Sequence, residues 1–104
     1  MRAFALDLPE AWEDDPWDDT VIKVRKKIFV FLGAERIAVK LPSSAEEALA
    51  VAGAAPMRYG LGRAGWVSVP LGPGAPPAGV LCDWVEESYR AVAPKTLSRQ
   101  LDSG

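Results

Sequence analysis

The stretch that decides the fold is residues 20–31, which reads TVIKVRKKIFVF in one-letter code. β-branched and aromatic residues fill both halves, and the pair Arg25-Lys26 separates them. Two such runs joined by two residues are typical of a β-hairpin. Two-residue turns usually contain Asn-Gly or Gly-Gly, so we expect the Arg-Lys turn to be mildly strained or longer than two residues.

Two further strands are predicted after the hairpin. Residues 36–41 read RIAVKL and alternate with a period of two, and Gly33-Ala34-Glu35 supplies the turn before them. Residues 66–71 read WVSVPL and follow a glycine-rich loop. The expected sheet is antiparallel and four-stranded, a three-stranded meander plus one later strand.

Three helices are expected around this sheet. A short first helix stops before Pro9, because the residue preceding a proline is pushed out of the helical region. A second helix follows Ser44, which forms a capping-box pattern with Glu47. In the third, apolar residues recur at spacings of three and four from Val80 to Val92. We expect residues 95–104 to fray after it.

The fold class that follows is α+β, with the helices packed on one face of the sheet and the other face open. If the hairpin turn is Arg25-Lys26, then Val24 lies opposite Lys27. Alternation then assigns four hairpin side chains to the core face: Ile22, Val24, Phe29 and Phe31. The other face receives Lys23, Ile28 and Val30, joined by Arg36 and Lys40 of the next strand.

Composition indicates one small globular domain. The chain has 104 residues, of which 49% are hydrophobic and 25% charged, so we treat residues 1–104 as a single domain. The single cysteine, Cys82, cannot form an intramolecular disulfide, which favours a reducing cytoplasm. No window approaches the roughly 20 apolar residues of a membrane span, so no membrane role is expected.

Charge is segregated along the chain, although the net charge is only −2. Residues 1–19 hold seven carboxylates against one arginine, whereas residues 20–69 hold eight cations against three carboxylates. This asymmetry can create a local positive potential that an acidic overall charge conceals. A polyanionic partner such as DNA is therefore compatible with the sequence.

The candidate nucleic-acid-binding residues are the cations of the middle segment and one tryptophan. They are Lys23, Arg25, Lys26, Lys27, Arg36, Lys40, Arg58, Arg63 and Trp66. The cations would contact phosphates and release condensed counterions, and Trp66 would stack on a base at the open face. Two alternatives stay open: a solvated hairpin whose lysines protect sheet edges, and a Trp66 that belongs to the core.

Other kinds of site have weaker support. The acidic residues 13–15 and 18–19 could bind a cation weakly or form a solvated turn, and no histidine is present to complete a metal site. Without histidine or a Gly-x-Ser-x-Gly motif, we expect no enzymatic activity, no metal and no cofactor. The loop 57–66, with Met57 and Tyr59, could instead form a protein or small-ligand site.

Several stretches together resemble the MmcQ/YjbR family of small bacterial proteins. They are Leu8-Pro9-Glu10-Ala11, Pro16-Trp17, Val21-Ile22-Lys23-Val24, Lys27-Ile28-Phe29, Val39-Lys40-Leu41, Gly65-Trp66-Val67 and Ser88-Tyr89. The resemblance covers about residues 6–93 and implies a fold like that of frataxin and CyaY, together with a DNA-binding role that has no defined target. The chain departs from the family in its short first helix and in lacking histidines between Tyr59 and Trp66. We expect a cytoplasmic monomer or weak dimer whose partner is DNA.

Overall fold

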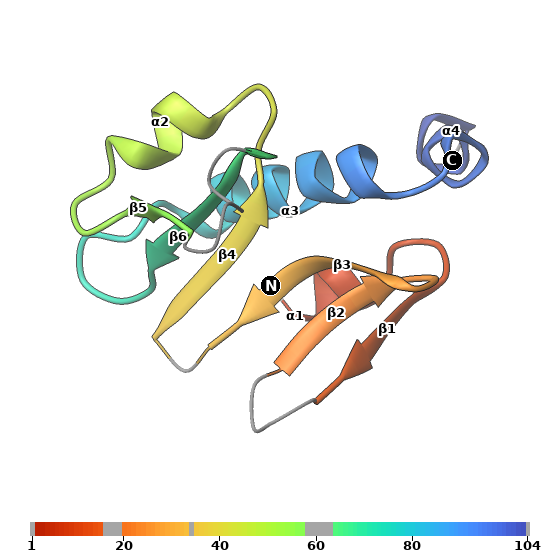
Figure 1. Cartoon of the computed structure of the whole chain (residues 1–104), viewed down its shortest axis with the longest axis horizontal. Coiled ribbons are helices and arrows are strands. Elements are labelled where there is room, and N and C mark those ends of the chain that lie inside the picture. Colours follow the sequence, from red (N-terminus) through yellow and green to blue (C-terminus); the bar gives the residue numbers. More distant parts are fainter. Residues whose placement is uncertain (1, 16–19, 34, 58–63, 104) are drawn as a thin grey trace.

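A computed structural model describes residues 2–15, 20–33, 35–57 and 64–103 (Figure 1). Its strands are β1 (Ala11–Asp14), β2 (Thr20–Val24), β3 (Lys27–Leu32), β4 (Arg36–Lys40), β5 (Ala55–Pro56) and β6 (Trp66–Pro70). They form one sheet in the order β1-β2-β3-β4-β6-β5, and every neighbouring pair is antiparallel. The helices are α1 (Arg2–Leu6), α2 (Ala45–Leu49), α3 (Ala78–Val92) and α4 (Lys95–Ser103).

The predicted α+β class and antiparallel sheet are confirmed, with β2, β3 and β4 as the meander and β6 as the later strand. The strand count was too low, because β1 and β5 add one edge strand on each side. β1 reads AWED and has a single aliphatic side chain, and β5 has two residues. Neither carries the run of β-branched residues by which strands are recognised in a sequence.

The hairpin has the predicted turn, but its face assignment was wrong beyond Phe29. Val24 pairs with Lys27 as expected, and Arg25 adopts a strained φ of 55°. The register then shifts between Ile22 and Lys23, so that β3 contains one extra residue. Such a bulge reverses the alternation that follows it. Val30 is consequently fully buried in the core, and Phe31 lies on the opposite face.

The core lies between the sheet and α3, which crosses the far side of the sheet in Figure 1. The apolar stripe predicted for this helix is confirmed, since Leu81, Trp84, Val85 and Tyr89 are buried. The Tyr89 ring meets Phe29 of β3 edge to face, with 5.2 Å between the ring centres. We call the opposite side of the sheet the open face.

The start of α2 is held by α3 and not by the predicted capping box. Ser44 makes no side-chain capping bond to the helix. Instead, the Glu87 carboxylate accepts hydrogen bonds from the backbone N–H groups of Ser43 and Ser44 and from the Ser44 hydroxyl. Glu87 thus satisfies the Ser44 N–H, which Glu47 would have bonded in a capping box.

Residues 95–103, expected to fray, form α4 against the end of α3. Leu97 is 2% exposed, and Arg90 of α3 reaches Asp102 at 3.0 Å. A helix can begin here because Pro94 introduces it, and proline suits the first turn of a helix. α4 thereby becomes one wall of the site described next.

None of the described helices is both long and apolar enough to cross a lipid bilayer.

Candidate functional site

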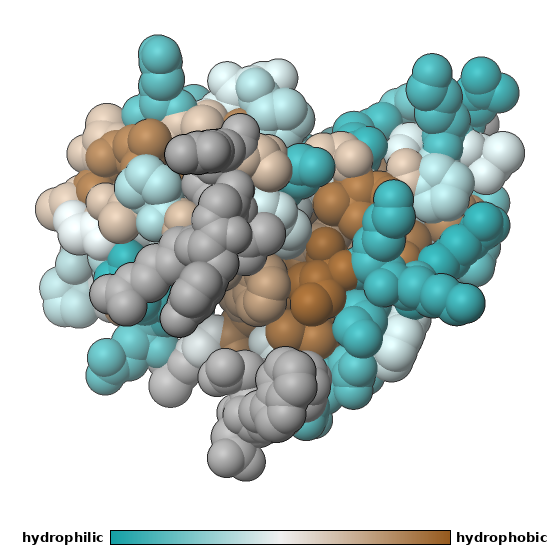
Figure 2. Space-filling view, viewed as in Figure 1, coloured by the Kyte–Doolittle hydropathy of each residue, from teal (hydrophilic) through white to brown (hydrophobic). Residues whose placement is uncertain are grey.

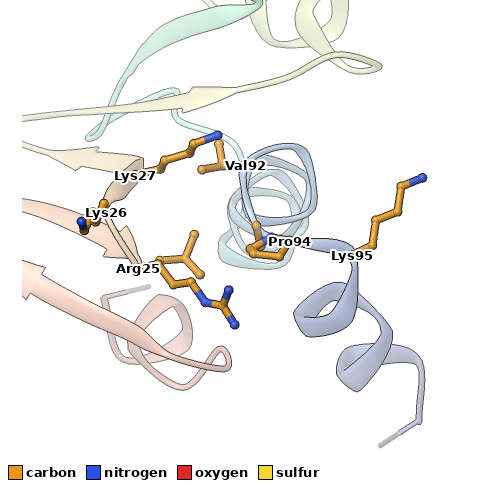
Figure 3. Close-up of a pocket in the computed structure, with 8 residues that line it drawn as sticks. Arg25, Lys26, Lys27, Val92, Pro94 and Lys95 are labelled. Carbon is orange, nitrogen blue, oxygen red and sulfur yellow. The ribbon is translucent and has the colours of Figure 1, made fainter.

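The hairpin turn and the junction of α3 with α4 enclose a cleft of about 510 Å³, which we call the basic cleft (Figure 3). It is lined by Val24, Arg25, Lys26 and Lys27 from the hairpin and by Val92, Ala93, Pro94 and Lys95 from the helix junction. Its lining combines aliphatic side chains with the stems of four cationic side chains. Two segments far apart in the sequence thus supply charge to one place.

The cations of the basic cleft differ in direction. In Figure 3, Lys27 extends toward Val92, and the Arg25 guanidinium extends toward the helix junction. Lys95 starts from the opposite wall and points away from the hairpin. The positive charge therefore spans both walls of the cleft and continues onto α4.

Most of this charge has no acidic partner within the described residues. The Arg25 guanidinium lies 3.4 Å from the Glu10 carboxylate, but both side chains are about half exposed (53% and 52%). An exposed pair of this kind contributes little and is easily exchanged for another anion. Among the described residues, no ion pair engages Lys26, Lys27 or Lys95, and all three are exposed. These ammonium groups are available to an external anion.

Lys23, the first of the predicted cations, has a carboxylate partner. Its Nζ lies 2.8 Å from Asp14 Oδ2 and 5.1 Å from the centre of the Trp12 ring. The hydrogen bond from Lys23 lowers the pKa of the Asp14 carboxyl below its usual value. Lys23 therefore joins β1 to β2 on the open face and adds little net charge there.

The remaining predicted cations do not gather at the basic cleft. Arg36 donates hydrogen bonds of 2.8 Å to Ser68 Oγ and to the Gly53 carbonyl, which ties β4 to β6 and to the segment before β5. Lys40 is half-buried opposite Trp66 in the β4–β6 pairing. Arg58 and Arg63 lie outside the described residues.

The open face is consequently more apolar than predicted. Figure 2 shows hydrophobic surface at its centre and hydrophilic surface on the right, where Figure 1 places the hairpin tip and α4. The cations expected to cover this face are engaged or half-buried, as Lys23, Arg36 and Lys40 show. Among the residues that the structure describes, its basic character is therefore confined to the hairpin end of the molecule.

Two tryptophans on the sheet, Trp66 and Trp12, differ in how much of their surface is exposed. Trp66, the predicted stacking residue, is 7% exposed and packs edge to face on Phe31 at 5.3 Å. Trp12, by contrast, is 43% exposed. Its Nε1 donates a 2.8 Å hydrogen bond to the Arg25 carbonyl, which places the indole beside the basic turn. In the sequence, the one indication of this exposure was the position of Trp12 between Pro9 and the acidic turn. The edge strand β1 that contains it is too short to recognise from the sequence.

Of the two alternative sites, the acidic one falls partly outside the described residues, because residues 18–19 are not among them. A hollow of about 220 Å³ on the open face is lined by Phe31, Arg36, Met57 and Ser68, among others, so Met57 of the loop 57–66 does border a concavity. Residues 58–63 of that loop lie outside the described residues. Within the part of the chain that is described, no three His, Cys, Asp or Glu side chains are grouped closely enough to hold a metal ion.

A family model described as YjbR matches residues 6–91, which includes the whole sheet, most of α3 and the hairpin side of the basic cleft. A search of curated proteins finds no match.

Proposed function

The chain belongs to the YjbR family, and we propose that it is a non-enzymatic protein that binds nucleic acid weakly and mainly through charge, at the basic cleft. The observation that supports this proposal is the gathering of Arg25, Lys26, Lys27 and Lys95 around one concavity. We further propose that the partner is DNA and that the protein acts in the cytoplasm. The compartment is proposed because a lone cysteine suits a reducing environment.

Phosphate binding follows from the electrostatics of these side chains. Lys26, Lys27 and Lys95 carry no acidic partner among the described residues, so contact with a phosphate costs no existing ion pair. Each contact releases condensed counterions from DNA, and this release supplies most of sequence-independent affinity. Three or four contacts predict weak binding that falls steeply with salt.

The shape of the site also suits a polyanion. The two-residue turn makes the hairpin tip narrow, and a β-ribbon of this kind can enter a groove or lie against a backbone. Val92 and Pro94, which line the cleft and are only half-buried, offer an aliphatic surface beside the charges. Such a surface can cover the carbon face of a sugar while the lysines hold its phosphates.

The test is fluorescence anisotropy of labelled DNA over a salt series, with two variants of equal net charge. Lys26→Gln with Lys27→Gln removes two positive charges from the cleft. Ala50→Glu with Ala52→Glu adds two negative charges at exposed positions beside α2, at the other end of the molecule in Figure 1. We expect the lysine variant to flatten the slope of log K against log salt by about 2 for duplex DNA. The alanine variant should keep the wild-type slope.

Two results would contradict the proposal. One is the absence of binding even at about 50 mM salt, where several phosphate contacts should be evident. The other is an equal loss of affinity in both variants, which would assign the effect to net charge and not to the cleft. Either result would turn attention to ligands of the hollow beside Met57.

A further inference from the structure

Trp12 is a large aromatic side chain that the fold leaves exposed beside the basic hairpin turn of Arg25, Lys26 and Lys27. It lies on β1 at the edge of the sheet and is 43% exposed, whereas Trp66 and Trp84 are 7% and 4% exposed. Burial of such a side chain would normally stabilise a small domain. The edge position leaves this apolar surface available to a ligand.

The indole is held in place by two contacts. Its Nε1 donates to the Arg25 carbonyl at 2.8 Å, and the Lys23 ammonium lies 5.1 Å from its ring centre. Lys23 is itself fixed by Asp14 at 2.8 Å. A preorganised ring loses little conformational freedom when a ligand stacks on it, so more of the stacking energy remains for binding.

Trp12 is also continuous with the basic turn. The carbonyl that accepts its hydrogen bond belongs to Arg25, and Lys26 and Lys27 follow directly in the chain. A ligand that covers the ring therefore places its neighbouring groups within reach of these cations. The matching ligand has a flat aromatic part joined to closely spaced negative charges.

We propose that the preferred ligand of this site is single-stranded nucleic acid, with an unpaired base stacked on Trp12 and the adjoining phosphates held by Arg25, Lys26 and Lys27. This inference rests on the proposed function and specifies its substrate class. A duplex offers the same phosphates but keeps its base faces inside the stack. Aromatic platforms beside a basic groove are the general means by which proteins select single strands without reading sequence.

The first test changes the ligand and leaves the protein intact. Anisotropy is measured at about 50 mM salt with a labelled oligothymidine strand, a duplex of equal length, and an abasic strand that keeps the phosphates but lacks the bases. We expect oligothymidine to bind about five- to 150-fold more tightly than the abasic strand, the range for loss of one stacked base. Equal affinity for these two strands would overturn the inference.

The second test changes Trp12. Trp12→Leu keeps an apolar side chain but removes the aromatic ring, whereas Trp12→Phe keeps a smaller aromatic ring and loses the indole N–H. Trp12→Leu should weaken oligothymidine binding far more than Trp12→Phe does and should leave duplex and abasic binding unchanged. Circular dichroism melting of each variant checks that the fold is retained. A loss of equal size on all three ligands would overturn the inference.

The failures of the two proposals are distinguishable. If the three ligands bind alike, and binding is lost in the Lys26→Gln, Lys27→Gln variant, the single-strand inference is wrong and the proposed function stands. If none of the three ligands binds at about 50 mM salt, both are wrong.

Discussion

Ser88 provides the sharpest prediction about how this fold is held together. Its side chain is fully buried on α3, and its Oγ donates to the Phe29 carbonyl at 2.5 Å and accepts from the Lys40 N–H at 2.8 Å. The direct pairing of β3 and β4 extends only from Val30–Val39 to Leu32–Ile37. The Ser88 hydroxyl therefore bridges the two strands just beyond the point where their ladder ends.

Ser88→Ala removes both bonds at once. A buried donor or acceptor left without a partner costs about 1–3 kcal/mol, and here one donor and one acceptor lose theirs. Water reaches the partly buried Lys40 amide more easily than the Phe29 carbonyl, so we expect a total loss of about 2–4 kcal/mol. Domains of this size are stable by about 5–15 kcal/mol, so the variant should fold but with much less stability.

The assay is urea unfolding followed by tryptophan fluorescence. Ser98→Ala is a matched control, because the Ser98 hydroxyl is buried and has no hydrogen-bond partner in the described structure. That substitution should be neutral or slightly stabilising. The reasoning would be refuted if Ser88→Ala lost less than about 0.5 kcal/mol, or if both variants lost the same amount.

Three further substitutions test the site and its surroundings. Burial raises the pKa of the Tyr89 phenol above 10.0, so the stability that it supplies is complete below pH 10 and is lost as pH rises through the folded-state value. The urea midpoint of the wild type should accordingly fall more steeply above pH 10 than that of Tyr89→Phe, and parallel curves would contradict this. Glu10→Gly should tighten DNA binding, because it frees Arg25 of its one carboxylate partner in the described structure. It should change the free energy of unfolding by no more than about 1 kcal/mol, since Glu10 has a φ of 59° that glycine tolerates. Arg25→Gly relieves a similar backbone strain, since Arg25 has a φ of 55°, but it should flatten the slope of log K against log salt by about 1. If anisotropy shows the two glycine variants changing affinity in the same direction, Arg25 is not a phosphate ligand.

The sequence predicts the fold class because its signals are local and repeated. The run TVIKV-RK-KIFVF determines the hairpin, and the spacing from Leu81 to Tyr89 determines the buried face of α3. The sequence-based predictions that were wrong concern features that depend on tertiary contacts. The bulge that moves Val30 into the core has no sequence mark, and the cap of α2 comes from Glu87, which lies 43 residues after Ser44.

The candidate site was predicted in part. The cluster of positive charge at residues 25–27 was evident from the sequence, because three consecutive cationic side chains at a tight turn cannot all be buried. Lys95 could not be found this way, since its place beside the hairpin depends on how α3 ends and α4 turns. Arg36 and Lys40 were assigned by alternation to the correct face, but alternation says nothing about the hydrogen bonds of Arg36 or the partial burial of Lys40.

The most direct test of the central claim is an NMR titration of the ¹⁵N-labelled protein with oligothymidine, which maps binding onto single backbone amides. The account predicts that the largest shift changes occur at the amides of residues 25–27, 93, 95 and 96 and at Trp12, including its indole N–H. Changes centred on residues 36–40 or on the loop 57–66, with the hairpin turn unaffected, would contradict it.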